Sequence, residues 1–155
     1  GRSLLVDVLG MPADGEELRA IVTAERDEAG WLEALAVRTT ELSEQERRTL
    51  AAYLAVNMPV PAPEAVVAAG VEPEALHDAL PRDGRDLAWH ECQYCHSLFT
   101  SHLMQDRGVQ AWLNMFLSPF HRQMSITQQE REEFAHYSAI NMPMKIEDVP
   151  EDLRF

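Results

Sequence analysis

The chain has 155 residues, of which 46% are hydrophobic, so it is long enough to bury the core of one or two small domains. It carries 26 acidic and 13 basic residues, and a formal net charge of -13 argues against binding to nucleic acid or to an anionic membrane surface. No apolar run approaches the ~20 residues of a membrane span, so we expect none. The chain begins at Gly1 without a leader, as expected of a mature or trimmed form.

Composition and patterning predict an all-α fold. Ala, Leu, Glu, Arg and Gln are abundant, and no stretch shows the sustained alternation of a strand. Pro and Gly concentrate in residues 60–85, which are therefore expected to form a linker with short helical turns at 64–69 and 73–79. We expect a small helical unit on each side of this linker, at 1–59 and 86–155.

The two predicted units resemble each other in sequence. An Arg and a Trp five residues apart occur in both, at an offset of 81: Arg26 and Trp31, then Arg107 and Trp112. Further along, Leu-Ser-Glu-Gln-Glu-Arg (42–47) matches Ile-Thr-Gln-Gln-Glu-Arg (126–131) at an offset of 84. Such internal similarity is typical of one supersecondary unit used twice.

Each copy also predicts the start of a helix. Ser43 with Glu46, and Thr127 with Glu130, fit a capping box, in which the hydroxyl and the carboxylate each bond a free backbone N–H group. Each helix is expected to follow a shorter one that carries the Trp. The two capped helices are expected at 44–56 and 128–140.

The only two cysteines lie in the segment Cys92-Gln93-Tyr94-Cys95-His96. In the Cys-x-x-Cys-His motif, the thiols form thioethers with the two vinyl groups of a porphyrin and the next residue binds its iron. We therefore predict one covalent haem c on Cys92 and Cys95, with His96 as the proximal iron ligand. Three alternatives remain open: a thioredoxin-like redox pair, a zinc site completed by His96 and His102, and two buried structural thiols.

The first copy lacks this motif. Its equivalent residues 11–15 contain neither Cys nor His, and the loop before its last helix is three residues shorter than the loop 117–125. That longer loop carries His121 and Met124. Two features that occur together in one copy suggest one group bound between them.

Residues 86 to about 143 resemble a class I c-type cytochrome, with a motif helix, a short middle helix, a ligand loop and a last helix bearing the inward-facing Tyr137. The spacing of Arg107 and Trp112 after the motif is similar to that of tandem di-haem cytochromes of periplasmic dehydrogenases. This chain departs from that family at Ser97, where Gly is common, and in its first copy, which has no haem motif.

The resemblance implies a sixth iron ligand in the loop before the last helix. Met124 is the first choice and His121 the alternative. Trp112 or Arg107 is expected to hydrogen-bond a haem propionate, and His102 to face solvent or lie near a propionate. The apolar residues expected around the porphyrin are Leu98, Phe99, Trp112, Leu113, Phe116, Phe120, Phe134 and Tyr137.

The expected function is electron transfer, not catalysis, as a cytochrome subunit or acceptor of a periplasmic oxidoreductase. The acidic charge predicts a dehydrogenase or reductase partner with a basic patch. Because c-type cytochromes mature outside the cytoplasmic membrane, the resemblance implies an exported protein of the bacterial periplasm. The alternative is a haem-based gas sensor or peroxide-reactive haem protein, in which neither Met124 nor His121 reaches the iron.

Overall fold

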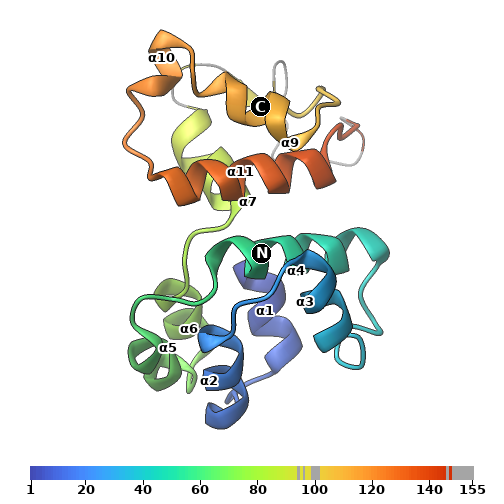
Figure 1. Cartoon of the computed structure of the whole chain (residues 1–155), viewed down its shortest axis with the longest axis vertical. Helices are drawn as coiled ribbons and strands as arrows, with labels where there is room; N and C mark the ends of the chain where they lie inside the picture. The colour runs from blue at the N-terminus through green and yellow to red at the C-terminus, as the bar shows by residue number, and fades with distance from the viewer. Residues whose placement is uncertain (94, 96, 99–101, 146, 148–155) are drawn as a thin grey trace. The chain divides into compact units, whose positions relative to one another are not determined.

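The computed structural model describes residues 1–93, 95, 97–98, 102–145 and 147, and every regular element in this part of the chain is a helix (Figure 1). The predicted all-α fold is confirmed. The chain divides into two compact units, Gly1–Arg82 (unit 1) and Asp83–Phe155 (unit 2). A separate finding is that none of the described helices is both long and apolar enough to cross a membrane.

Unit 1 is built from short helices around one longer helix. Asp14, Asp27 and Ser43 each accept a hydrogen bond from the first turn of the helix that they precede. The predicted capping box of Ser43 and Glu46 is present. The helices of unit 1 are α1 (Arg2–Leu9), α2 (Gly15–Thr23), α3 (Glu28–Ala34), α4 (Glu44–Asn57), α5 (Pro63–Ala69) and α6 (Pro73–Ala79).

Residues 60–82, most of the expected linker, pack within unit 1. The short helical turns expected there are α5 and α6, and each begins with a Pro, which needs no N–H partner at that position. The buried side chains of Val66, Leu76 and Leu80 join the same core as Trp31 and Leu50. The Pro residues in this stretch therefore start two helices, and its buried aliphatic side chains pack these helices onto the core of unit 1.

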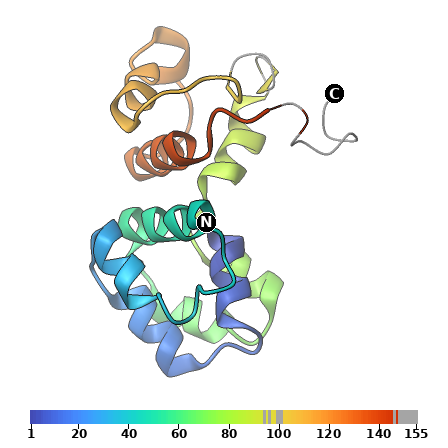
Figure 2. The ribbon, with the colours of Figure 1, turned by 90° about the vertical axis from the view of Figure 1, so that its right-hand side faces the viewer.

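The described part of unit 2 centres on helix α11. The helix expected at 128–140 is α11, and the predicted capping box of Thr127 and Glu130 is present. Helix α11 packs against both α7 and α9, as Figures 1 and 2 show. The described helices of unit 2 are α7 (Gly84–Leu87), the π-helix η1 (Ala88–Cys92), α9 (Val109–Met115), α10 (Pro119–Arg122) and α11 (Gln128–Asn141).

The contact between α7 and α11 fixes the segment that leads into the cysteines. A Cβ atom on Gly84 would lie 2.1 Å from the Cβ atom of Tyr137, so only glycine permits this approach. The Gly84 N–H donates to Oε1 of Glu133 at 3.0 Å, and the Glu133 side chain is buried. Helix α7 is therefore anchored on α11, and η1, which packs on α7 and ends at Cys92, follows it directly.

Candidate functional site

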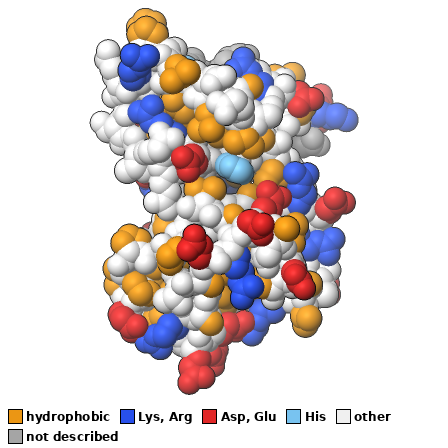
Figure 3. Space-filling view, viewed as in Figure 1, with side chains coloured by type: hydrophobic (Ala, Val, Ile, Leu, Met, Phe, Trp, Pro, Cys, Tyr) orange, Lys and Arg blue, Asp and Glu red, His pale blue; other side chains and the backbone are white. Residues whose placement is uncertain are grey.

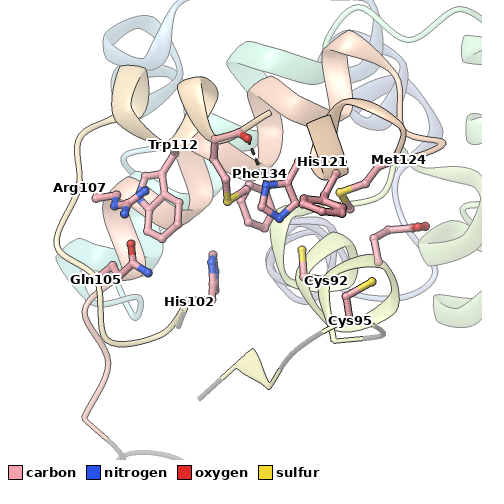
Figure 4. Close-up of a pocket in the computed structure, with 12 residues that line it drawn as sticks. Cys92, Cys95, His102, Gln105, Arg107, Trp112, His121, Met124 and Phe134 are labelled. Carbon is pink, nitrogen blue, oxygen red and sulfur yellow. Dashed lines mark hydrogen bonds between the residues drawn. The ribbon is translucent and has the colours of Figure 1, made fainter. Parts of the chain in front are cut away.

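A cavity of about 470 Å³ lies in unit 2 (Figure 4). This volume falls within the range of about 300–1,000 Å³ that is typical of ligand and cofactor pockets. In Figure 4, Cys92 and Cys95 lie on one side of the cavity, and His121 and Met124 on the other. The lining residues are Glu91, Cys92, Cys95, His102, Gln105, Arg107, Trp112, Met115, Phe120, His121, Met124 and Phe134.

Both cysteines of the motif are free thiols at this cavity. Cys92 ends η1 and is partly buried, and its Sγ donates a weak hydrogen bond to the carbonyl oxygen of Leu87 at 3.8 Å. Cys95 is exposed. His96, the predicted iron ligand, lies outside the described residues, so the structure places two of the three motif side chains.

The environment of Cys92 differs from that of a redox-active thiol. Burial raises the pKa of the Cys92 thiol to about 12, and the neighbouring Glu91 carboxylate adds to the rise. A reactive Cys-x-x-Cys pair instead has a cysteine pKa that is lowered by a helix N-terminus or a nearby cation. At neutral pH the Cys92 sulfur therefore stays protonated, which disfavours the thioredoxin-like alternative.

The ligand loop reaches the cavity through α10. Ser118 caps this helix, because its Oγ accepts the backbone N–H of His121 at 3.4 Å. The same Oγ lies 3.0 Å from Nδ1 of His121, and the carbonyl oxygen of Met115 lies 3.2 Å from that nitrogen. Met124 is partly buried and packs on the core of unit 2. Both candidate sixth ligands thus line the cavity that the cysteines line.

Arg107 and Trp112 also line the cavity, but unit 1 repeats their contact. The Arg107 guanidinium lies 5.4 Å from the centre of the Trp112 ring, and Arg26 lies 5.7 Å from that of Trp31. Among the described residues, neither Trp31 Nε1 nor Trp112 Nε1, both buried, has a hydrogen-bond partner. Because the unit without the motif shares these features, they do not by themselves indicate a haem propionate.

The apolar residues expected around a porphyrin divide into two groups. Trp112, Phe120 and Phe134 line the cavity, although Phe120 is also 88% exposed to solvent. The side chains of Leu113, Phe116 and Tyr137 do not line the cavity and pack in the core of unit 2, to which Trp112 and Phe134 also belong. Leu98 is buried, and Phe99 lies outside the described residues.

His102 is the site residue whose environment the sequence did not predict. It was expected to face solvent or to lie near a propionate, but its exposed fraction is 4%. The centre of its ring lies 4.8 Å from that of Trp112 and 4.9 Å from that of Phe134, and both contacts are tilted. Its Nε2 lies 3.5 Å from Ser138 Oγ on α11. These partners come from distant parts of the chain, so no local pattern around residue 102 reveals them.

The structure leaves the zinc alternative untested, because one of its four ligands, His96, lies outside the described residues. Within the part of the chain that is described, no three His, Cys, Asp or Glu side chains form a group that could hold a metal ion.

The chain was compared with protein-family models, with curated proteins and with solved structures, and none of them matches it. The geometry of the cavity therefore carries the functional argument.

Proposed function

We propose that unit 2 binds one haem c covalently and that the protein is an electron-transfer protein. The observation that carries this proposal is that the motif lies at the cavity. Cys92 and Cys95, the only cysteines of the chain, both line the cavity. A cavity of this size beside a Cys-x-x-Cys-His motif suits a bulky apolar cofactor better than a single ion.

The side chains at the motif and the cavity have the chemistry needed to hold a haem. Cys92 and Cys95 would hold it by thioether bonds, and His96 is the protein ligand that the motif assigns to its iron. When bound, haem supplies an iron that takes up and releases one electron. Trp112 and Phe134 form an aromatic wall with ring centres 6.1 Å apart, and such a wall excludes water from the bound group.

Two side chains that can bind iron line the side of the cavity opposite the cysteines. Either His121 or Met124, together with His96, would supply two protein ligands to the iron and would leave no open position for a small molecule. This supports electron transfer over the gas-sensor or peroxide-reactive alternative, in which one position stays open. The protein is then not itself an enzyme.

The proposal also includes the partner and the compartment of the protein. Its partner is a redox protein, a dehydrogenase or reductase subunit with a basic patch that complements the net charge of -13. Its compartment is the bacterial periplasm, where c-type cytochromes mature. Unit 1, which has no Cys, supports unit 2 or provides a docking surface.

The test is the mass and absorption spectrum of the chain made in cells that mature c-type cytochromes. We expect a mass one haem above that of the bare chain, a Soret band, and a pyridine haemochrome spectrum of haem with two thioethers. The variant Cys92→Ala/Cys95→Ala is expected to lose the bound haem, while Met11→Ala, in the equivalent segment of unit 1, keeps it. A bare-chain mass without a Soret band contradicts the proposal.

A second measurement separates the two functions. The ferrous protein is exposed to carbon monoxide, and we expect its spectrum to stay unchanged because both axial positions are filled. A spectrum that shifts at once favours the sensor or peroxide-reactive function.

A further inference from the structure

We propose that His121, and not Met124, is the second iron ligand of unit 2, and that Met115 and Ser118 position its ring. This inference rests on the proposed haem and specifies its site. It replaces the first choice made from the sequence, because the structure provides an orienting contact for the imidazole that a thioether cannot have.

The first argument is the hydrogen bonding of the His121 ring. A backbone carbonyl oxygen only accepts hydrogen bonds, so the 3.2 Å contact between Nδ1 and the Met115 oxygen requires a proton on Nδ1. Ser118 Oγ, at 3.0 Å, lies close enough to share that proton. With the proton on Nδ1, the lone pair of a neutral ring is on Nε2, which is the atom that would bind iron. Histidines that bind metals usually donate their other ring N–H to a carbonyl or carboxylate in this way.

The second argument is the origin of α10. Copy 2 has three more residues than copy 1 between the Trp and the capped helix, and in the structure this longer stretch contains α10. The corresponding residues of unit 1, between α3 and α4, form only turns. The extra residues therefore build a capped turn of helix that carries His121 to the wall of the cavity.

Met124 has a simpler structural explanation. It follows the last turn of α10, where its backbone N–H donates to the carbonyl oxygen of His121 at 3.3 Å. Its side chain packs with the partly buried residues around the core of unit 2. Methionine commonly fills irregular gaps in this way, so its place at the cavity needs no bond to iron.

The other imidazole at the cavity, His102, is already used in packing. Its ring contacts the rings of both Trp112 and Phe134, and Ser138 Oγ lies 3.5 Å from its Nε2. Ser138 donates its own proton to the carbonyl oxygen of Phe134 at 2.7 Å, so towards His102 it can act as an acceptor. Nε2 of His102 is then the protonated nitrogen, and this geometry assigns the ring to the core.

The choice of ligand determines what the protein can do. A methionine opposite histidine raises the reduction potential of a haem, whereas two imidazoles leave it lower. With His96 and His121 on the iron, the protein is a carrier of low potential. Because its potential is lower, it would need a stronger reductant as electron donor than a His–Met cytochrome does.

The experiment is near-infrared magnetic circular dichroism of the oxidised, haem-bearing wild-type protein, which needs no variant. We expect the charge-transfer band of bis-imidazole iron. The band of thioether-bound iron in the wild type overturns the inference. A sample without covalent haem would instead refute the proposed function, so the two failures are distinguishable.

Three variants identify the residue. His121→Met is expected to gain the thioether band and a higher potential, while Met124→Leu and His102→Gln keep the bis-imidazole band. Loss of that band in His102→Gln, with His121→Met unchanged, assigns the ligand to His102 and overturns the inference. If His121→Met does not fold, the wild-type spectrum and the two other variants still decide the question.

The role of Ser118 is tested separately. Ser118→Ala removes one of the two acceptors at Nδ1, so the imidazole becomes a weaker electron donor. We expect the bis-imidazole band to remain and the potential to rise, and Ser118→Thr to restore the wild-type potential. A potential that does not change in Ser118→Ala shows that Ser118 only caps α10.

Discussion

Units 1 and 2 share local contacts but differ in what their cores enclose. In both, a capping box starts the long helix, an Asn near its end donates to the carbonyl oxygen of a Tyr at 2.9 Å, and an Arg lies over a buried Trp. In unit 2, the same framework borders a cavity lined by two thiols and two imidazoles. The shared contacts therefore describe the fold, and the differences locate the function.

One pair of equivalent positions shows how the difference arises. At the offset of 81 residues, Ile21 in α2 corresponds to His102, and both side chains are buried. In unit 1, Ile21 joins Leu18 and Val22 in a continuous aliphatic core. In unit 2, the equivalent stretch contributes His102 and Gln105 to the cavity wall. Aliphatic side chains thus fill this part of the core in unit 1. At the equivalent positions, unit 2 presents polar side chains to its cavity.

The largest expected effect tests the packing that anchors the motif. Gly84 and Gly15 are both the first residue of a helix, after the N-caps Asp83 and Asp14. Gly84→Ala forces a Cβ atom to within 2.1 Å of Tyr137, and we expect it to lower the free energy of unfolding by about 3 kcal/mol. Gly15→Ala meets only Val67, at 3.8 Å, and should be neutral or stabilise the protein by up to about 1 kcal/mol.

Urea denaturation of both glycine variants checks this prediction. Equal midpoints for the two would mean that α7 does not approach α11 as closely as the structure has it.

A second prediction concerns alkaline pH. Burial raises the pKa of Tyr137 to about 12, and the nearby Asp83 carboxylate adds to the rise. The unfolded phenol ionises near pH ~10, so below that pH both states are neutral and Tyr137 adds no pH dependence. Between about pH 10 and 12 only the unfolded state loses its proton, and stability falls by roughly 1.4 kcal/mol per pH unit, about 2–3 kcal/mol in all.

Unfolding of the wild type and of Tyr137→Phe is compared at pH 8, 10 and 11.5. The variant is expected to lose less stability than the wild type over this range, because it has no phenol to ionise. Parallel pH profiles for the two proteins would contradict the raised pKa.

The third prediction uses the capping boxes. Because Ser43 and Thr127 make the same contacts at the starts of α4 and α11, Ser43→Ala and Thr127→Ala should each cost about 1 kcal/mol. Thr127→Ser and Ser43→Thr are the matched controls, since they keep the hydroxyl. Thermal denaturation checks the symmetry, and a cost confined to one unit would show that the two long helices are not equivalent in energy.

The sequence predicted the parts of the fold that depend on local chemistry. The capping boxes located α4 and α11 to within one residue at their C-terminal ends, and the turns expected at 64–69 and 73–79 are α5, which begins one residue earlier at Pro63, and α6. What it missed depends on distant contacts. The packing of α5 and α6 within unit 1 and the contacts of the His102 ring with Trp112 and Phe134 join residues far apart in the chain.

The candidate site was predictable to a similar degree. The motif and the longer loop identified Cys92, Cys95, Met124 and His121, and the structure brings these four to one cavity. The preference for His121 over Met124 that we propose could not be derived from the sequence. It rests on the carbonyl oxygen of Met115, and no residue type reveals the direction of a backbone carbonyl group.

The smallest expected effect concerns the Arg–Trp contact that the two units share. It tests whether this contact also has a function in unit 2. Arg26 and Arg107 are both exposed and lie over a Trp at similar distances, so Arg26→Gln and Arg107→Gln should each cost about 0.5 kcal/mol. If Arg107 also contacts a haem propionate, its loss removes a positive charge near the iron and lowers the reduction potential, because a nearby cation disfavours the oxidised state, which carries one positive charge more. The propionate carboxylate, left without its cation, also favours the oxidised state and shifts the potential in the same direction. Redox titration of both variants checks this prediction, and a lower potential is expected for Arg107→Gln alone. Unchanged potentials in both variants would leave the pair as a structural contact common to the two units.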